Sequence, residues 1–254
     1  MTDDARPLSS ARVLGVGVAA LDVINRVEVY PQEDDEVRAL DQDVRRGGNA
    51  TNTLVMLAQL GHRCAWAGTL GDDAASEQIL ADLGRHGVGA SLCVRHAGGH
   101  TPTSYVTLSR ASGSRTIVHH RDLPELSARA FSSFDLDRFD WAHFEGRDPD
   151  QTAPMLRDLA ARRAELPVSL EVEKPRSGVE RLFDGPRVLI FSRVYAASRG
   201  YADPVRFLAD QWSNVSAELL FLAWGAGGAY GQARGGPVRH ARSYAPPRVE
   251  DTLG

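Results

Sequence analysis

The residues best suited to chemistry near the start of the chain are two glycines followed by two asparagines. Gly47 and Gly48 directly precede a predicted helix, and Asn49 and Asn52 lie one turn apart at its start. Glycines let the backbone approach a ligand, the N–H groups of a helix N-terminus point outward, and amides both donate and accept hydrogen bonds. The combination suits a polyhydroxylated molecule. An ordinary turn with Asn49 as the helix cap explains the same residues, and spacing alone does not separate the two interpretations.

An earlier glycine pattern, residues 15–20, matches the G-x-G-x-x-A fingerprint of dinucleotide-binding folds. That fingerprint requires a helix to start at the second glycine. Residues 21–30 are instead rich in β-branched side chains and lead to Pro31. We therefore interpret the pattern as a strand end whose small residues allow another group to approach, with Asp22 just beyond it.

Two later strands are followed by candidate site residues. Glu171 and Glu173 are two apart on a predicted strand, so both side chains would face the same side. Such a pair could do acid–base work or hold a metal ion, and paired carboxylates also occur in glycosidases. The plainer alternative is that both are solvated carboxylates at a strand end. The glycine-rich stretch 224–229 follows strand 219–223, where nucleotides often dock, but a hairpin turn explains it equally well. The eight histidines have no metal-ligand spacing, and we assign no metal site.

Alternating strand and helix patterns position these residues. Strands are predicted at 12–18, 23–30, 64–68, 105–108, 115–119, 141–144, 168–172, 188–191 and 219–223, and helices at 49–60, from Asp72 or Asp73 to Gly87, 152–164 and 203–212. This order predicts one α/β domain over residues 1–254, with a mostly parallel central sheet flanked by helices. Two β excursions, at about 23–45 and 101–121, interrupt the rhythm and predict a small β lid.

Composition limits the classes of partner. The chain has 254 residues, 43% of them hydrophobic, and a net charge of -4, which gives no electrostatic reason to bind nucleic acid or an anionic membrane. No apolar run reaches membrane-spanning length, and the start of the chain is acidic where a signal peptide would be basic. Cys64 and Cys93 are expected to be buried free thiols. We expect a cytoplasmic protein with small-molecule partners.

Taken together, several stretches resemble the ribokinase-like (PfkB) family of sugar kinases in order and spacing. The family motifs are similar to residues 47–52, 71–73, 224–229 and 251–254. Stretches shared with the ketohexokinase branch of the family are 20–24, 30–34, 46–50, 115–118, 143–147, 171–176 and 246–248. The similarity spans nearly all of residues 12–254.

The resemblance implies an ATP- and Mg²⁺-dependent enzyme that phosphorylates a sugar hydroxymethyl group, with fructose to fructose 1-phosphate as the leading case. Another sugar or a nucleoside remains an alternative substrate within the family. By match to the family pattern, the sugar would be held by Asp22, Gly47, Gly48, Asn49 and Asn52, with Arg115 and Glu145 nearby on the lid side.

The resemblance also implies a homodimer formed through the β lid. The acidic residue Asp34 would reach into the site of the partner subunit. Without the resemblance, the acidic run at 33–36 would be interpreted as a solvated loop.

On the nucleotide side, the residues that match the family pattern are Arg193, Trp224, Gly225, Gly228, Thr252 and Gly254. Arg193 stands where the branch tends to carry lysine, and the turn after Trp224 lacks the acidic residues of related chains. These departures concern nucleotide contacts and base preference.

The family pattern at 251–254 continues into Ala-Gly-Asp at a helix start, where glycine N–H groups form an anion hole and the aspartate is the base. Only the first glycine of that hole, Gly254, is in the sequence. We therefore expect the base and the C-terminal helices to be missing and the chain as written to be inactive. The alternatives are a kinase whose sequence is incomplete and a truncated, non-catalytic sugar-binding protein.

Overall fold

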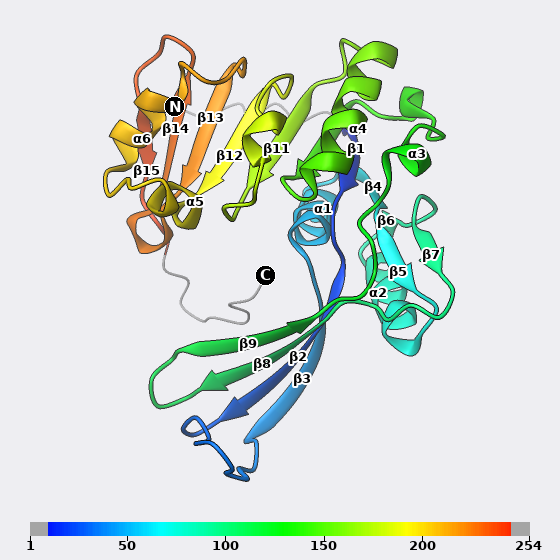
Figure 1. The fold of residues 1–254 in the computed structure, drawn as a ribbon, viewed down its shortest axis with the longest axis vertical. Helices are drawn as coiled ribbons and strands as arrows, with labels where there is room; N and C mark the ends of the chain where they lie inside the picture. The colour runs from blue at the N-terminus through cyan, green and yellow to red at the C-terminus, as the bar shows by residue number, and fades with distance from the viewer. Residues whose placement is uncertain (1–9, 245–254) are drawn as a thin grey trace, which may run out of the picture.

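A nine-stranded sheet forms the body of the protein in a computed structural model that describes residues 10–244 (Figure 1). The strand order is β15-β14-β13-β12-β11-β10-β1-β4-β6. All neighbours from β13 to β6 pair in parallel, whereas β14 and β15 are antiparallel. The bounds are β1 Arg12–Val16, β4 Arg63–Ala67, β6 Val88–Gly89, β10 Trp141–Glu145, β11 Val168–Val172, β12 Val188–Ser192, β13 Leu219–Ala223, β14 Ala229–Ala233 and β15 Arg239–Ala241.

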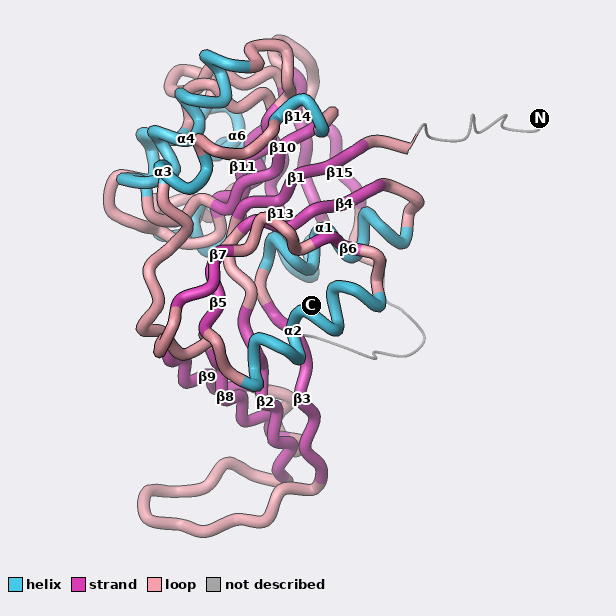
Figure 2. Tube along the Cα trace, turned by 90° about the vertical axis from the view of Figure 1, so that its right-hand side faces the viewer, coloured by secondary structure: helices cyan, strands magenta, loops and turns pink. Residues whose placement is uncertain are grey.

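Helices pack on both faces of this sheet (Figure 2). One face carries α1 Asn49–Gln59 and α2 Ala74–Arg85, which pack around Trp66, Ile79 and Leu83. The other face carries α3 Ala128–Phe131, α4 Pro149–Arg162, α5 Arg193–Ser198 and α6 Pro204–Gln211, with short 3₁₀ turns η1 Leu136–Arg138 and η2 Val179–Leu182. A third 3₁₀ turn, η3 Gly225–Gly227, joins β13 to β14.

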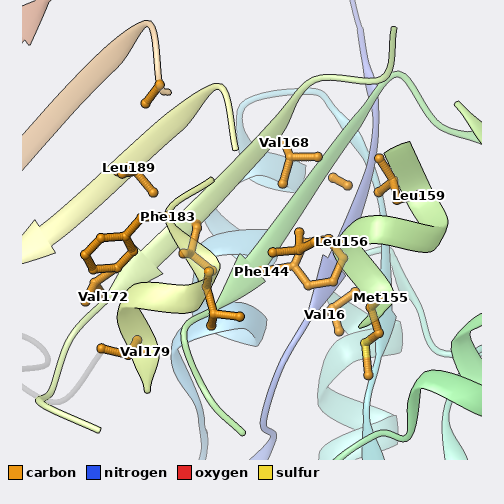
Figure 3. Close-up of a cluster of buried hydrophobic side chains, with 14 of the residues drawn as sticks. Val16, Phe144, Met155, Leu156, Leu159, Val168, Val172, Val179, Phe183 and Leu189 are labelled. Carbon is orange, nitrogen blue, oxygen red and sulfur yellow. The ribbon is translucent and has the colours of Figure 1, made fainter. Parts of the chain in front are cut away.

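The larger core lies between the sheet and α4 (Figure 3). Met155, Leu156 and Leu159 recur on one face of α4 and pack beside Phe144 and Val168 on β10 and β11. Burying each such side chain stabilises the fold by about 1.5–3 kcal/mol. This packing holds the middle strands, and therefore their carboxyl ends, in fixed positions.

A second, four-stranded sheet projects from the body as a lid (Figures 1 and 2). Its order is β3-β2-β8-β9, with bounds β2 Ala20–Val27, β3 Asp41–Gly47, β8 Thr103–Ser109 and β9 Arg115–His120. The two hairpins β2–β3 and β8–β9 are antiparallel, and β2 pairs with β8 in parallel. A small parallel pair, β5 Thr69–Gly71 with β7 Val94–His96, lies beside the entry to β8.

The predicted fold class is confirmed: a mostly parallel sheet flanked by helices, with a small β lid. The first lid strand begins at Ala20 and ends at Val27, earlier than the expected 23–30, because its extent is set by pairing with β3 and β8. Cys64 and Cys93 are free, the first buried and the second partly buried. Within residues 10–244, no helix combines the length and the apolar character needed to cross a membrane.

Candidate functional site

The glycine pair before α1 brings a carboxylate to the helix start. Asp22 on β2 lies directly over Gly47, since a Cβ added to Gly47 would sit 2.2 Å from Asp22 Oδ2. Gly48 has a φ of 111° and its Cβ would meet the Val18 carbonyl oxygen at 2.1 Å. Gly48 therefore requires glycine, and a side chain at Gly47 would displace the Asp22 carboxylate.

Asn49 opens α1 and reaches the central sheet. Its Nδ2 donates a hydrogen bond to Glu171 Oε1 at 3.0 Å. Glu171 lies near the end of β11, in register with Glu145 at the end of β10. The helix start and the carboxyl ends of two parallel strands therefore meet at one place.

Glu145 is hydrogen-bonded to the start of α1. Its Oε1 accepts hydrogen bonds from the backbone N–H groups of Ala50 (2.6 Å) and Val18 (3.3 Å). A Cβ at Gly17 would lie 2.6 Å from Glu145 Cδ, so the small residues after β1 make room for this carboxyl group. The G-x-G pattern is followed by strand β2 and by no helix, as expected, and Glu145 Oε1 is engaged by backbone N–H groups of the protein itself.

Both carboxyl groups are protonated more readily than usual. Burial raises the pKa of Glu145 to about 7 against the opposing effect of the Ala50 N–H. Burial, followed by repulsion from Glu145 and Glu173, raises the pKa of Glu171 to about 8. The expectation that strand-end carboxylates are solvated therefore does not hold for Glu171.

Asn52 lies one turn along α1 and is held by Arg46. The Arg46 guanidinium donates to Asn52 Oδ1, to Thr51 Oγ1 at 2.9 Å and to Asp82 Oδ2 at 2.7 Å. Arg46 is the last residue before the glycine pair, so this network ties the lid strand β3 to α1 and α2. The amide oxygen of Asn52 is thereby engaged, which leaves its NH₂ group for other partners.

The lid side of the site is lined by a histidine and two arginines. Asp22, Ser104 and His119 lie in one row across β2, β8 and β9, and Ser104 Oγ is 3.1 Å from His119 Nδ1. Burial and then the charges of Arg147 and Arg121 lower the pKa of His119. Arg147 Nε donates to Glu125 at 2.9 Å and lies 3.8 Å from Glu145.

The residues expected to hold a nucleotide lie at the carboxyl ends of neighbouring strands. The Arg193 guanidinium at the start of α5 stacks over the Trp224 ring, 5.5 Å from its centroid. Gly225 and Gly228, both with positive φ, form the turn from β13 into the antiparallel β14. The stretch is therefore a hairpin turn and also lies at the sheet edge where ligands dock.

Asp34 and Arg115 lie apart from these residues. Arg115 pairs with Leu108, four positions along β8 from Ser104, which is roughly 13 Å along the strand. Asp34 is exposed in the loop between β2 and β3, at the far end of the lid from the body. Thr252 and Gly254 lie outside the described residues.

Three residues at the site were not predicted to hold the sugar: Glu171, which was considered only as half of a carboxylate pair with Glu173, and His119 and Arg147. A charged residue within the apolar strand 168–172 was the signal for Glu171, and strand alternation placed His119 on a definite face. Neither signal says which strand is adjacent. In the part of the chain that the structure describes, no three metal-ligating side chains cluster.

Comparisons with known proteins agree with this geometry. The family model of the pfkB carbohydrate kinases matches residues 10–191. The chain belongs to the pfkB family of carbohydrate kinases. Mouse ketohexokinase is 36% identical over 97% of this chain and 86% of its own length. Rice fructokinase-1 is 37% identical over a shorter stretch, 30% of this chain and 23% of its own length.

Two solved ribokinase structures share the fold at low sequence identity. Arabidopsis thaliana ribokinase complexed with ribose and ATP matches with a TM-score of 0.78 and 19% identity, covering 96% of this chain and 82% of its own. Ribokinase from Thermotoga maritima matches with a TM-score of 0.71 and 15% identity, covering 94% and 80%. At this identity the match concerns the fold alone.

Proposed function

We propose that this carbohydrate kinase transfers the γ-phosphoryl group of ATP to a hydroxymethyl group of a sugar, with fructose as the leading substrate and fructose 1-phosphate as product. The observation that carries the proposal is the meeting of Asp22, the Gly47–Gly48 backbone and Asn49 at the start of α1. The identity to mouse ketohexokinase supports fructose over other sugars. Another sugar or a nucleoside would use the same site.

The sugar-binding side combines acidic, amide and arginine side chains, with Arg46 against Asn52 and Arg147 3.8 Å from Glu145. The Asp22 carboxylate can accept from vicinal hydroxyls, while the Asn49 amide oxygen and the Asn52 NH₂ group are left to bind further hydroxyls once Glu171 and Arg46 have engaged the other halves of these amides. The buried carboxyl group of Glu145 accepts from the Ala50 N–H at the start of α1, which fixes the helix end that carries these ligands. Preorganisation of this kind reduces the entropy cost of binding.

The phosphate side follows the sheet edge toward Arg193 and Trp224. Phosphoryl transfer depends mainly on alignment and on neutralising charge, and Arg193 supplies a cation at that edge. By resemblance, the general base would be the aspartate that follows the pattern at 251–254, so no residue of the given sequence is assigned that role.

Magnesium belongs to this proposal as the partner of the nucleotide. Mg²⁺ is usually held by one or two carboxylates, water and substrate phosphates, and it needs no cage of protein ligands. The absence of a three-residue cluster within residues 10–244 is compatible with that mode. When bound with ATP, the ion neutralises charge on the phosphates.

We further propose a homodimer through the lid, in which Asp34 approaches the partner's site. The apolar side chains Val44 on β3, Tyr105 on β8 and Val118 on β9 are 44–66% exposed on one face of the lid. Exposed apolar groups gathered on one element favour a protein partner, and a second copy of the lid offers a matching surface.

The proposal is tested with ATP and protein expressed from the full coding sequence, because the base is expected to follow Gly254, over a panel of fructose, ribose, other ketoses and nucleosides. ADP release is coupled to an absorbance readout, and the product is identified by mass and by the position of the phosphate. We expect fructose to be phosphorylated at its 1-hydroxymethyl group, and Asp22→Asn to raise its KM at least about tenfold. Sugar binding without any phosphorylation by the encoded protein would contradict the proposed function.

A further inference from the structure

One hydrogen bond at the site determines whether a sugar would meet the oxygen or the NH₂ group of the Asn49 amide. Asn49 donates through Nδ2 to Glu171 Oε1, at 3.0 Å. This is the contact that the Asn49 side chain makes within residues 10–244. In this part of the chain, the buried side-chain atoms without a hydrogen-bond partner are Arg121 Nη1 and His143 Nε2. Asn49 Oδ1 is not one of them, so this oxygen is accessible to solvent or to a ligand.

The position of Glu171 is set by the fold and not by Asn49. The residue is the fourth of β11, in register with Glu145 on one side and Ile190 on the other, and its backbone oxygen accepts from the Gly146 N–H at 2.7 Å. The neighbouring Val172 is fully buried in the core. Because its strand is held in place, the Glu171 side chain can fix the orientation of a side chain at the start of α1.

We propose that Glu171 is a positioning residue that orients the Asn49 amide, so that the sugar meets the amide oxygen and not the NH₂ group. The inference rests on the proposed sugar-binding function and deepens it. A carboxyl group presents an acceptor oxygen to Asn49, which draws the NH₂ group toward the sheet and turns the carbonyl away.

The consequence is selectivity for sugars that donate hydrogen bonds. Asp22, as a carboxylate, only accepts, and an Asn49 amide held in this way also accepts on the open side. Two acceptors close together require two hydroxyl donors on the ligand. An analogue with hydrogen, fluorine or methoxy in place of one of these hydroxyls leaves an acceptor unpaired.

Two carboxyl groups and one amide act on Glu171. Glu145 on β10 and Glu173 just past β11 both repel it, and Asn49 on α1 is its hydrogen-bonding partner. Glu173 differs from Glu171 in being 41% exposed and 3.6 Å from Lys174. Glu173 is therefore a matched control for substitutions of Glu171, since it is also a glutamate and lies two residues away.

The test compares Glu171→Leu, Glu171→Gln and Glu173→Leu with the wild type by calorimetric titration of fructose and its 3-deoxy and 4-deoxy analogues. We expect the wild type to bind at least one deoxy analogue about tenfold or more weakly than fructose. Glu171→Leu should reduce that ratio to within about threefold, whereas Glu171→Gln, which keeps an acceptor oxygen, and Glu173→Leu should preserve it.

A second readout does not depend on sugar binding. The side-chain NH₂ signals of Asn49 in a ¹⁵N correlation spectrum, assigned by their loss in Asn49→Asp, should move in Glu171→Leu and stay in place in Glu173→Leu. If no sugar on the panel binds, the proposed function fails while this spectrum still decides the role of Glu171. An unmoved Asn49 signal and an unchanged selectivity ratio in Glu171→Leu would overturn the inference.

Discussion

At the scale of single residues, the site depends on glycines that leave room for a carboxylate. Gly47→Ala places a Cβ against Asp22 Oδ2, at 2.2 Å in the unrelaxed geometry, so the carboxylate must move. We expect sugar affinity to fall at least about tenfold and the free energy of unfolding to fall by about 1–3 kcal/mol. Titration calorimetry and urea unfolding measure the two effects.

The matched control for this change is Gly84→Ala. Gly84 lies within α2, and a Cβ there meets nothing within 4 Å. Alanine is favoured over glycine inside a helix by about 0.5–1 kcal/mol, so this variant should be slightly more stable and bind sugar normally. Equal sugar affinity in the wild type and Gly47→Ala would argue against Asp22 as a ligand.

The buried carboxyl groups predict a pH dependence of stability. The native pKa values of Glu145 and Glu171 are raised to about 7 and about 8, above the value of 4.5 for an unperturbed glutamate. Between these values the native state holds protons that the unfolded chain has lost. The free energy of unfolding contributed by these groups is therefore fully present at low pH and falls as pH rises from about 5 to about 8.

Glu171→Gln isolates this effect because glutamine stays neutral. The variant should gain stability relative to the wild type as pH rises from about 5 to about 8, on the order of 2 kcal/mol, measured by urea unfolding. Burial lowers the pKa of His143 to about 4, which acts in the opposite direction but is common to both proteins. A stability difference that stays constant across this range would disprove the role assigned to burial.

At the scale of elements, the start of α2 links the body to the approach to the lid. Asp73 caps the helix by accepting from the Ser76 N–H at 2.9 Å, and it also accepts from the Thr101 N–H at 2.8 Å and the Thr101 hydroxyl at 2.7 Å. Burial opposes ionisation, but the hydrogen bonds from Thr101 and Ser76 prevail and hold the pKa of Asp73 at about 2.

Asp73→Ala should therefore lower the free energy of unfolding by about 1–3 kcal/mol, since it removes the cap and leaves Thr101 donors unpaired. Thermal and urea unfolding near neutral pH measure the loss, which should shrink as pH falls from about 4 toward about 2. The control is Asp150→Ala in the first turn of α4, where the side chain is 79% exposed and the change should be within about 0.5 kcal/mol. Equal losses in both variants would mean that the cap contributes nothing specific.

At the scale of the whole molecule, the lid is the surface on which a second copy would dock. Val44, Val23, Tyr105 and Val118 lie in one row across its four strands. Val44 is 44% exposed, Tyr105 52% and Val118 66%. A row of this kind would be covered by the partner in a lid-mediated dimer.

The double change Tyr105→Glu and Val118→Glu should convert a dimer into a monomer in sedimentation velocity at micromolar concentration, since it buries two charges in the interface. Met56→Glu, on an α1 residue that is 57% exposed and outside the lid, is the control and should leave the dimer intact. A wild type that sediments as a monomer, or a dimer unaffected by the lid changes, would rule out the proposed assembly.

Sequence patterns by themselves determined several of the local elements of this protein, although short ones such as α5 and β14 were not predicted. Strands 168–172 and 219–223 were predicted with the observed bounds, and the helix that begins at Asn49 extends to within one residue of its predicted end. Periodicity, glycine stops and capping residues act within a few positions of the chain, so they can be recognised without knowing the fold.

Only the tertiary structure decided which of these elements meet. Asp22 lies over Gly47 because β2 and β3 pair in one particular register, and Glu171 reaches Asn49 because β10 and β11 are neighbours in the sheet. The same pairing places Arg115 far along the lid from Asp22. Strand order and register depend on contacts between residues distant in sequence, and local patterns carry no information about that pairing.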